Sequence, residues 1–171
     1  MTERALAHVL IVDDSRLERE LAREALEASC RVSCADSAEE ALETLRRESV
    51  DLILSDLTMP GLTGLELLAR TQREHPGIDF VLLTGNASVE SAVEALRMGA
   101  ADYLRKPIQG EELAYVVERT LVRRRLREEN VRLRDELAAL EACRGLAPCL
   151  ESGEVYAVAL DVLLRTLSRG R

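Results

Sequence analysis

The sequence predicts an α/β fold built on a doubly wound, five-stranded parallel sheet. Short apolar runs alternate along the chain with longer amphipathic stretches of helical period, which is the pattern of repeated βα units. Two of the runs, LILS and FVLLT, are apolar almost throughout, as central strands covered on both faces must be. Polar residues stand directly after several of the runs, where an open parallel sheet gathers its functional groups.

Each expected strand is short and is followed by a helical pattern. The helix after the first strand begins at Ser15, with Glu18 three residues later, and Ser37 with Glu40 repeats this capping-box spacing before the second helix. Gly99 after ALRM indicates a left-handed helix end. Right-handed crossovers then give a flavodoxin-like sheet of strand order 2-1-3-4-5. The expected strands are Val9–Val12, Arg31–Ala35, Leu52–Ser55, Phe80–Leu83 and Asp102–Leu104.

Composition and charge exclude several classes of function. The 171 residues are 47% apolar, which suffices for a core, and carry a net charge of −8, which argues against nucleic-acid binding by the chain as a whole. We expect no membrane segment, because no run of 18 apolar residues is present. The four cysteines lack CxxC spacing and fit free thiols in a reducing compartment. We therefore expect a cytoplasmic protein.

Five residues with functional side chains lie where predicted strands end. Asp13 and Asp14 follow the first strand, Asp56 the third, Thr84 the fourth and Lys106 the fifth. Because the carboxyl ends of parallel strands meet at one edge of a sheet, we expect these side chains to converge. Carboxylates suit Mg²⁺, which prefers oxygen ligands and keeps several waters, and an ammonium group suits phosphoryl oxygens.

The segments that carry these residues read HVLIVDDS, VDLILSDLTMPG, FVLLTG and ADYLRKPI. They resemble the receiver (CheY-like) domain of two-component response regulators, over about residues 6–122. The resemblance implies that Asp56 accepts a phosphoryl group from a sensor histidine kinase or phosphotransfer protein, so that the chain is a phosphoacceptor regulatory domain and no turnover enzyme. It also implies Mg²⁺ as cofactor, with Asp14 and Asp56 as direct ligands, Asp13 acting through a water, and the backbone carbonyl of Thr58 as a further ligand.

The same resemblance assigns roles around the acceptor. Lys106 would contact the phosphoryl oxygens, and Thr84 would donate its hydroxyl to one of them. Tyr103 would turn inward as Thr84 moves, forming a two-state switch; a half-buried strand tyrosine without that role is the alternative. Pro107 fits the cis peptide of the family, and Gly85 leaves space for an arriving phosphate.

Two other classes of protein with a similar sheet fit the sequence less well than the receiver. A haloacid-dehalogenase-type phosphatase carries a second aspartate two residues after its nucleophile, whereas Asp13 and Asp14 are adjacent and Ser15 follows them. A flavin carrier needs a Gly/Ser/Thr loop that cradles phosphate after the first strand, and DDSRLERE is not such a loop. The remaining alternative is a dimerisation scaffold that has the receiver fold but acts without phosphorylation.

The fifth helix is predicted to continue beyond the receiver. No Gly or Pro occurs between Glu111 and Cys143, and helix formers dominate this stretch of on the order of 50 Å. Apolar residues and one asparagine recur within it at spacings alternating between four and three, the pattern of a coiled-coil seam. An asparagine at an a position favours a parallel, in-register homodimer through helix 111–143; an exposed single helix is the alternative. The seam residues are Leu126, Asn130, Leu133, Leu137 and Leu140.

These patterns divide the chain into three parts. We expect a receiver domain over residues 1–122, a coiled-coil extension over 123–144, and a linker with a further helix over 145–171. That last helix is apolar on most faces and so requires burial on several sides. It fits the start of an output domain; a short helix that closes the dimer as a small bundle is the alternative.

Overall fold

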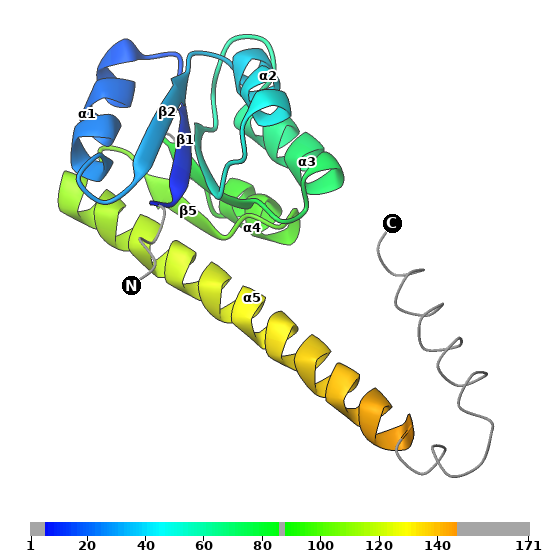
Figure 1. Ribbon diagram of the computed structural model, residues 1–171. Helices are drawn as coiled ribbons and strands as arrows, with labels where there is room; N and C mark the ends of the chain where they lie inside the picture. Colours follow the sequence, from blue (N-terminus) through cyan, green and yellow to red (C-terminus); the bar gives the residue numbers. More distant parts are fainter. Residues whose placement is uncertain (1–5, 86–87, 147–171) are drawn as a thin grey trace. The chain divides into compact units, whose positions relative to one another are not determined.

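The computed structural model describes residues 6–85 and 88–146, with side chains up to residue 141. It divides into two compact units, Met1–Arg124 and Arg125–Arg171, and helix α5 has residues in both. Strands and helices alternate from the start of the chain (Figure 1). In order they are β1 (His8–Val12), α1 (Arg16–Leu26), β2 (Arg31–Ala35), α2 (Ala38–Arg47), β3 (Leu52–Asp56), α3 (Gly64–Glu74), β4 (Asp79–Thr84), α4 (Val89–Arg97), β5 (Asp102–Arg105) and α5 (Gly110–Leu146).

The strands form a parallel sheet in the order β2-β1-β3-β4-β5. This confirms the predicted fold class and strand order, and all five expected strands are present. β2 has the predicted bounds and the other four strands are one or two residues longer than predicted, so that Asp56 is the last residue of β3 and Thr84 the last residue of β4. The register pairs Ser55 with Leu82 and Leu83 with Leu104, which aligns the carboxyl ends of β3, β4 and β5.

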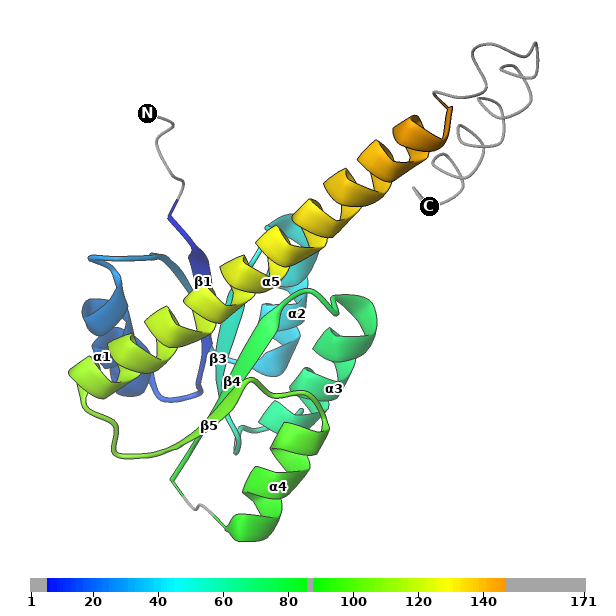
Figure 2. The same cartoon turned by 90° about the horizontal axis from the view of Figure 1, so that it is seen from below.

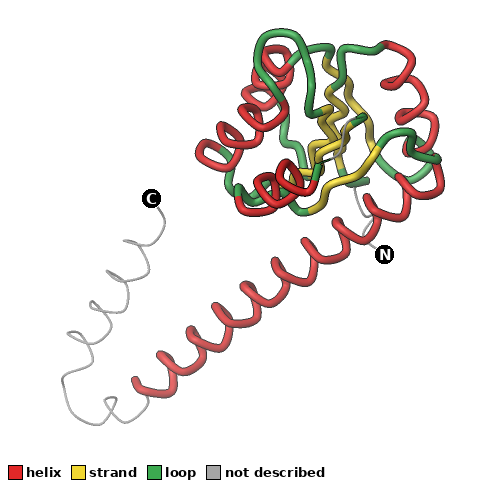
Figure 3. The backbone as a smooth tube through the Cα atoms, turned by 180° about the vertical axis from the view of Figure 1, so that it is seen from behind, coloured by secondary structure: helices red, strands yellow, loops and turns green. Residues whose placement is uncertain are grey.

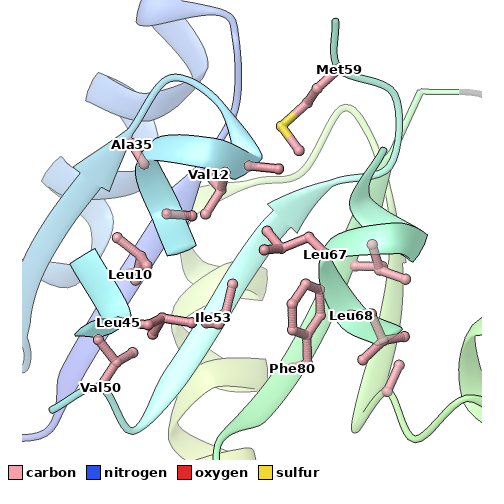
Figure 4. Close-up of a cluster of buried hydrophobic side chains, with 14 of the residues drawn as sticks. Leu10, Val12, Ala35, Leu45, Val50, Ile53, Met59, Leu67, Leu68 and Phe80 are labelled. Atoms are coloured by element: carbon pink, nitrogen blue, oxygen red, sulfur yellow. The ribbon is translucent and has the colours of Figure 1, made fainter. Parts of the chain in front are cut away.

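Helices cover both faces of the sheet (Figures 2 and 3). Alternate residues of a strand point to opposite faces, and the buried side chains separate accordingly into two clusters. One cluster packs the sheet against α2, α3 and α4, and the Phe80 ring lies in it among Ile53, Leu67 and Leu68 (Figure 4). The other packs Val9, Ile11, Leu54 and their neighbours against α1 and the start of α5.

The helix ends follow the predicted residues, but neither predicted glutamate closes a capping box: at α1 the Ser15 N–H donates to Asp13 Oδ1 and not to Glu18. The N-caps of α1 and α2 are the two expected serines, and each hydroxyl accepts from the backbone N–H three residues later. At α2, however, the Glu40 carboxylate accepts from the N–H of Asp36 at 2.7 Å, one residue before the cap. A complete capping box occurs at α3, between Thr63 and Glu66. Gly99 ends α4 in the left-handed region, with φ +98°, as predicted.

Among the described residues, no helix has both the length and the apolar character needed to cross a bilayer. Cys30 and Cys34 are free thiols. The long fifth helix is present and continues to Leu146. The predicted linker and helix of 145–171 lie outside the described residues from residue 147 onward.

Candidate functional site

The carboxyl edge of the sheet brings the acidic residues together. Asp13 and Asp14 follow β1, and Asp56 ends β3, the neighbouring strand. One carboxylate oxygen from each of the three lies within 4.8 Å of the others. Asp13 and Asp56 are buried and Asp14 is exposed. Three carboxylates at this spacing, one of them open to solvent, are a suitable donor set for a hard divalent cation such as Mg²⁺.

Asp13 is held by the protein through each of its polar groups. Its backbone N–H donates to the Ala35 carbonyl at 3.2 Å, and its own carbonyl accepts from Nη1 of Arg19 at 2.5 Å. Its carboxylate accepts from the Ser15 N–H at 2.9 Å and from Lys106 Nζ at 2.5 Å. No sequence pattern predicts this role for Arg19, because a charged residue on an exposed helix carries no signal of a partner six residues away.

Lys106 faces two of the carboxylates. Its Nζ lies 2.5 Å from Asp13 Oδ2 and 3.4 Å from Asp56 Oδ1, and the side chain is 15% exposed. Its backbone N–H donates to the Thr84 carbonyl at 2.7 Å, and the Lys106–Pro107 peptide is cis, as expected. Burial alone would lower the pKa of Lys106, but the hydrogen bond to Asp13 and the charges of Asp13 and Asp56 outweigh it and raise the pKa. The ammonium group is therefore charged.

The Asp56 carboxylate is set apart by its burial. Burial raises its pKa, the negative charge of Asp13 raises it further, and the nearby Lys106 ammonium offsets these effects in part. The carboxylate therefore lies in an environment that disfavours its ionised form. A cation bound beside the carboxylate would stabilise its negative charge. A phosphoryl group bonded to one of its oxygens would remove that charge from the carboxylate.

The loop that follows Asp56 is tied back to the sheet and to α3. The Leu57 N–H donates to the Leu83 carbonyl at 2.8 Å, and the Gly64 N–H donates to the Leu57 carbonyl at 3.0 Å. A Cβ on Gly64 would lie only 2.2 Å from the Asp56 carbonyl oxygen and 2.9 Å from Leu82 Cδ2. The start of α3 therefore packs directly on the backbone of Asp56, and only glycine permits this approach.

The other predicted residues lie on β4, on β5 and in the segments that follow β3 and β4. Thr84 is 1% exposed, and a Cβ on Gly85 would meet no atom within 4 Å, so the space beside Gly85 is open. Thr58 is exposed, two residues beyond Asp56. Tyr103 packs against the α2–α4 cluster, and its hydroxyl lies 2.8 Å from the Ser91 Oγ on α4. No local pattern predicts Ser91 as the partner of Tyr103, because this contact depends on how α4 is placed on β5.

A cavity of about 300 Å³ adjoins the site between α1 and the start of α5. Glu18 and Leu21 line it from α1, and Lys106 and Ile108 line it from the segment after β5. Leu17 and Leu21 on α1 are 64% and 54% exposed. An apolar recess and exposed leucines therefore lie beside the acidic cluster.

Comparison with known proteins decides the family. Residues 9–118 match the model of the response regulator receiver domain. The chain belongs to this family. Response regulator protein FleR of Pseudomonas aeruginosa is 42% identical over 114 residues, which are 66% of this chain and 24% of FleR. The C4-dicarboxylate transport transcriptional regulatory protein DctD of Rhizobium meliloti is 36% identical over 143 residues, 83% of this chain and 31% of DctD.

Solved structures agree with this assignment. A CheY-like response regulator receiver domain protein from Methanospirillum hungatei JF-1 superposes with a TM-score of 0.69 at 31% identity, over 72% of this chain and 99% of that one. The predicted membership of the receiver family and the predicted fold are thus both confirmed. The chain spans about a quarter to a third of the length of the curated relatives named above. Receiver domains as a class are regulatory phosphoacceptors that bind Mg²⁺ at an acidic pocket and interact with sensor kinases. This chain has a cluster of three aspartates at the carboxyl edge of its sheet.

Proposed function

We propose that Asp56 accepts a phosphoryl group from a phosphohistidine on a sensor kinase or phosphotransfer protein. An Asp56 carboxylate oxygen attacks phosphorus, the phosphorus–nitrogen bond of the donor breaks, and the imidazole leaves with the electron pair of that bond. The observation that supports this proposal is the position of Asp56, at the end of β3 with Lys106 Nζ 3.4 Å from its Oδ1 and two further carboxylates beside it. A chain that works in this way is a regulated acceptor and does not turn over a substrate.

The hydrogen bonds that each carboxylate already accepts determine how it would bind Mg²⁺. Both carboxylate oxygens of Asp13 already accept hydrogen bonds, from Ser15 and from Lys106, so Asp13 would contribute through a water. Asp14 and Asp56 would be direct ligands, with the Thr58 carbonyl as a further ligand. When bound, Mg²⁺ supplies positive charge that neutralises the clustered carboxylates and the phosphoryl oxygens.

Lys106 and Thr84 would act on the transferred group. The Lys106 ammonium already lies between Asp13 and Asp56 and would donate to a phosphoryl oxygen as charge develops there. Thr84 ends the strand next to β3 and would donate its hydroxyl to another oxygen. The open space beside Gly85 leaves a path for the phosphoryl group. Positioning and charge neutralisation carry most of such a transfer.

The signal would leave the site through Tyr103. Movement of Thr84 toward the phosphoryl group frees space at the ends of β4 and β5, and Tyr103 turns into it. This turn breaks the contact between the Tyr103 hydroxyl and Ser91, which releases the first turn of α4. A local change of charge thereby biases a two-state element.

A dimer would carry the signal onward. The leucines of the predicted seam are 52% to 63% exposed along α5, and an exposed leucine row needs a partner to cover it. We propose that a second copy covers it, in a homodimer through helix 111–143 with Asn130 paired to its twin. In this scheme residues 1–122 are the receiver, 123–144 the coiled-coil extension, and the segment from 145 leads to an output module. The seam residues in question are Leu126, Leu133, Leu137 and Leu140.

The partner that brings the phosphohistidine would dock on α1. The exposed Leu17 and Leu21 stand beside the cavity that opens onto Lys106. An amphipathic helix that presents a histidine would cover these leucines and bring its phosphoryl group to Asp56. Helix-in-groove recognition of this kind relies on a few apolar anchors.

Binding of beryllofluoride, a mimic of the phosphoryl group, tests the proposed function. In fluorine NMR with Mg²⁺, the wild-type chain should show bound beryllofluoride, Asp56→Ala should show none, and Asp36→Ala, a control on the exposed loop before α2, should bind as wild type does. Bound signal in Asp56→Ala would contradict the proposal. Light scattering of the same samples tests the relay: a change of mass or shape in wild type alone supports it. An unchanged dimer in every sample supports the scaffold alternative, and a monomer throughout contradicts the dimer.

A further inference from the structure

Arg124 forms a cluster of contacts at the opposite edge of the sheet from Asp56. Its Nη1 donates to the Asp51 carbonyl at 3.2 Å and also to the Gly77 carbonyl. Its Nη2 lies 3.5 Å from Asp51 Oδ1, and the side chain is 19% exposed. Arg124 lies in α5 and is the last residue of the compact unit Met1–Arg124.

The groups that Arg124 contacts lie at the starts of two central strands. Asp51 directly precedes β3, and Gly77 lies two residues before β4. The Asp79 N–H at the start of β4 also donates to the Asp51 carbonyl, at 3.2 Å, so both strands and α5 meet at this oxygen. The far ends of the same strands carry Asp56 and Thr84. Five or six residues of strand, on the order of 20 Å, separate the two ends.

Asp51 is itself braced against the first two strands. Its Oδ2 accepts from the His8 N–H at 2.8 Å, and its N–H donates to the His8 carbonyl at 2.9 Å. His8 is buried, with 4% of the residue exposed. Its Nδ1 donates to the Ser49 carbonyl at 2.7 Å, and its Nε2 lies 2.8 Å from Ser33 Oγ. Because a carbonyl only accepts, Nδ1 carries the ring proton. Asp51, which Arg124 contacts, is therefore held in place by hydrogen bonds to β1.

We propose that Arg124 is a positioning residue that ties α5 to the starts of β3 and β4, so that a displacement of these strands at the acceptor is passed to α5. The relay rests on the proposed function for its signal and is separate from the route through Tyr103. Two carbonyls and a carboxylate around one planar guanidinium suit the fork of arginine, and a lysine ammonium cannot reach all three. Arg123, the neighbouring residue, is exposed and is a matched control.

Hydrogen exchange of the whole chain, followed by mass spectrometry, tests the tie without any ligand. In Arg124→Gln, amides over residues 117–124 should exchange about tenfold faster than in wild type, because hydrogen bonds from a charged group are lost. Arg124→Lys should fall between the two, and Arg123→Gln should match wild type. Equal exchange in Arg124→Gln and Arg123→Gln would overturn the proposal.

A second arm adds Mg²⁺ and beryllofluoride. Wild type should show altered exchange both around Asp56 and over residues 117–124. Arg124→Gln should keep the change around Asp56 and lose the change over 117–124, whereas Arg123→Gln keeps both. A full response over 117–124 in Arg124→Gln would refute the relay. No response around Asp56 in wild type would count against the proposed function and thus against the relay, while the ligand-free comparison would still decide whether Arg124 holds the helix.

Discussion

Replacing Lys106 with methionine should destabilise the metal-free protein by about 2–4 kcal/mol. The Nζ lies 2.5 Å from Asp13 Oδ2 and 3.4 Å from Asp56 Oδ1, and the three side chains are 15%, 3% and 13% exposed. Removing one partner of a fully buried ion pair costs about 3–5 kcal/mol, and an exposed pair contributes about 1 kcal/mol or less. Because the three side chains are slightly exposed, the expected loss of stability lies between the values for a fully buried pair and an exposed pair. Methionine preserves most of the apolar stem, so the loss reports on the charge.

Urea unfolding in the presence of a chelator, followed by circular dichroism, measures this loss. With a slope of about 1–3 kcal/mol per molar urea, the midpoint should fall by about 1–2 M at neutral pH. Burial raises the pKa of Asp56 above its ordinary value, so its ionised form costs stability at neutral pH and this cost disappears as the carboxyl binds a proton. The difference in urea midpoint between wild type and Lys106→Met should therefore shrink as the pH falls through the raised pKa of Asp56. Added Mg²⁺ should narrow it too.

Arg16→Met is the matched control for this prediction. Arg16 pairs with Glu20 at 2.7 Å, but its side chain is 85% exposed, so the urea midpoint of Arg16→Met should stay close to that of wild type. Equal midpoints for Lys106→Met and Arg16→Met would refute the electrostatic reasoning. A loss in Lys106→Met that is the same at every pH would assign the effect to packing of the stem.

Three further outcomes are expected. Gly64→Ala should destabilise by about 1–3 kcal/mol in urea unfolding, because its Cβ meets backbone at 2.2 Å, while Gly77→Ala, with no atom within 4 Å, should be neutral or slightly stabilising. Hydrogen bonds from Thr63 lower the pKa of Glu66 from 4.5, so wild type should exceed Glu66→Gln in stability above that pH, and the difference should vanish as the pH falls through the lowered value. Thr71→Val should stabilise the protein by about 1 kcal/mol and so raise its thermal midpoint, because the buried Thr71 hydroxyl finds no hydrogen-bond partner among the described residues. An unchanged or lower thermal midpoint in Thr71→Val would contradict this prediction.

The fold was predictable because local patterns carried it. The runs around Leu54 and Val81 are apolar enough to require burial on both faces, and the helical periods between strands allow only crossover connections. Gly99 after ALRM predicted a left-handed helix end, and the resemblance to the receiver family implied a cis peptide at Pro107; both are present. The residue types at the strand ends were sufficient to bring Asp56 and its neighbours into one cluster, because parallel strands end at a common edge.

What the sequence did not predict depends on long side chains that reach across elements. Arg19 and Arg124 lie on helices where charged residues are ordinarily solvated, yet each donates to backbone carbonyls far from its own turn. The contact of Tyr103 with Ser91 depends on the distance between α4 and β5, which no local pattern encodes. At α2 the Glu40 carboxylate accepts from the Asp36 N–H and not from the N–H of the Ser37 cap, and the capping-box spacing does not distinguish these neighbouring donors.

The most direct test of the central proposal is to locate a transferred phosphoryl group. The chain would be incubated with Mg²⁺ and a small-molecule phosphodonor, and the product digested and sequenced by mass spectrometry after reduction of the acyl phosphate to a stable alcohol. We expect one modified site, at Asp56, that disappears when Mg²⁺ is chelated and in Asp56→Asn, and is strongly reduced in Lys106→Met. Modification at another residue, or equal labelling of Asp56→Asn, would contradict the proposal.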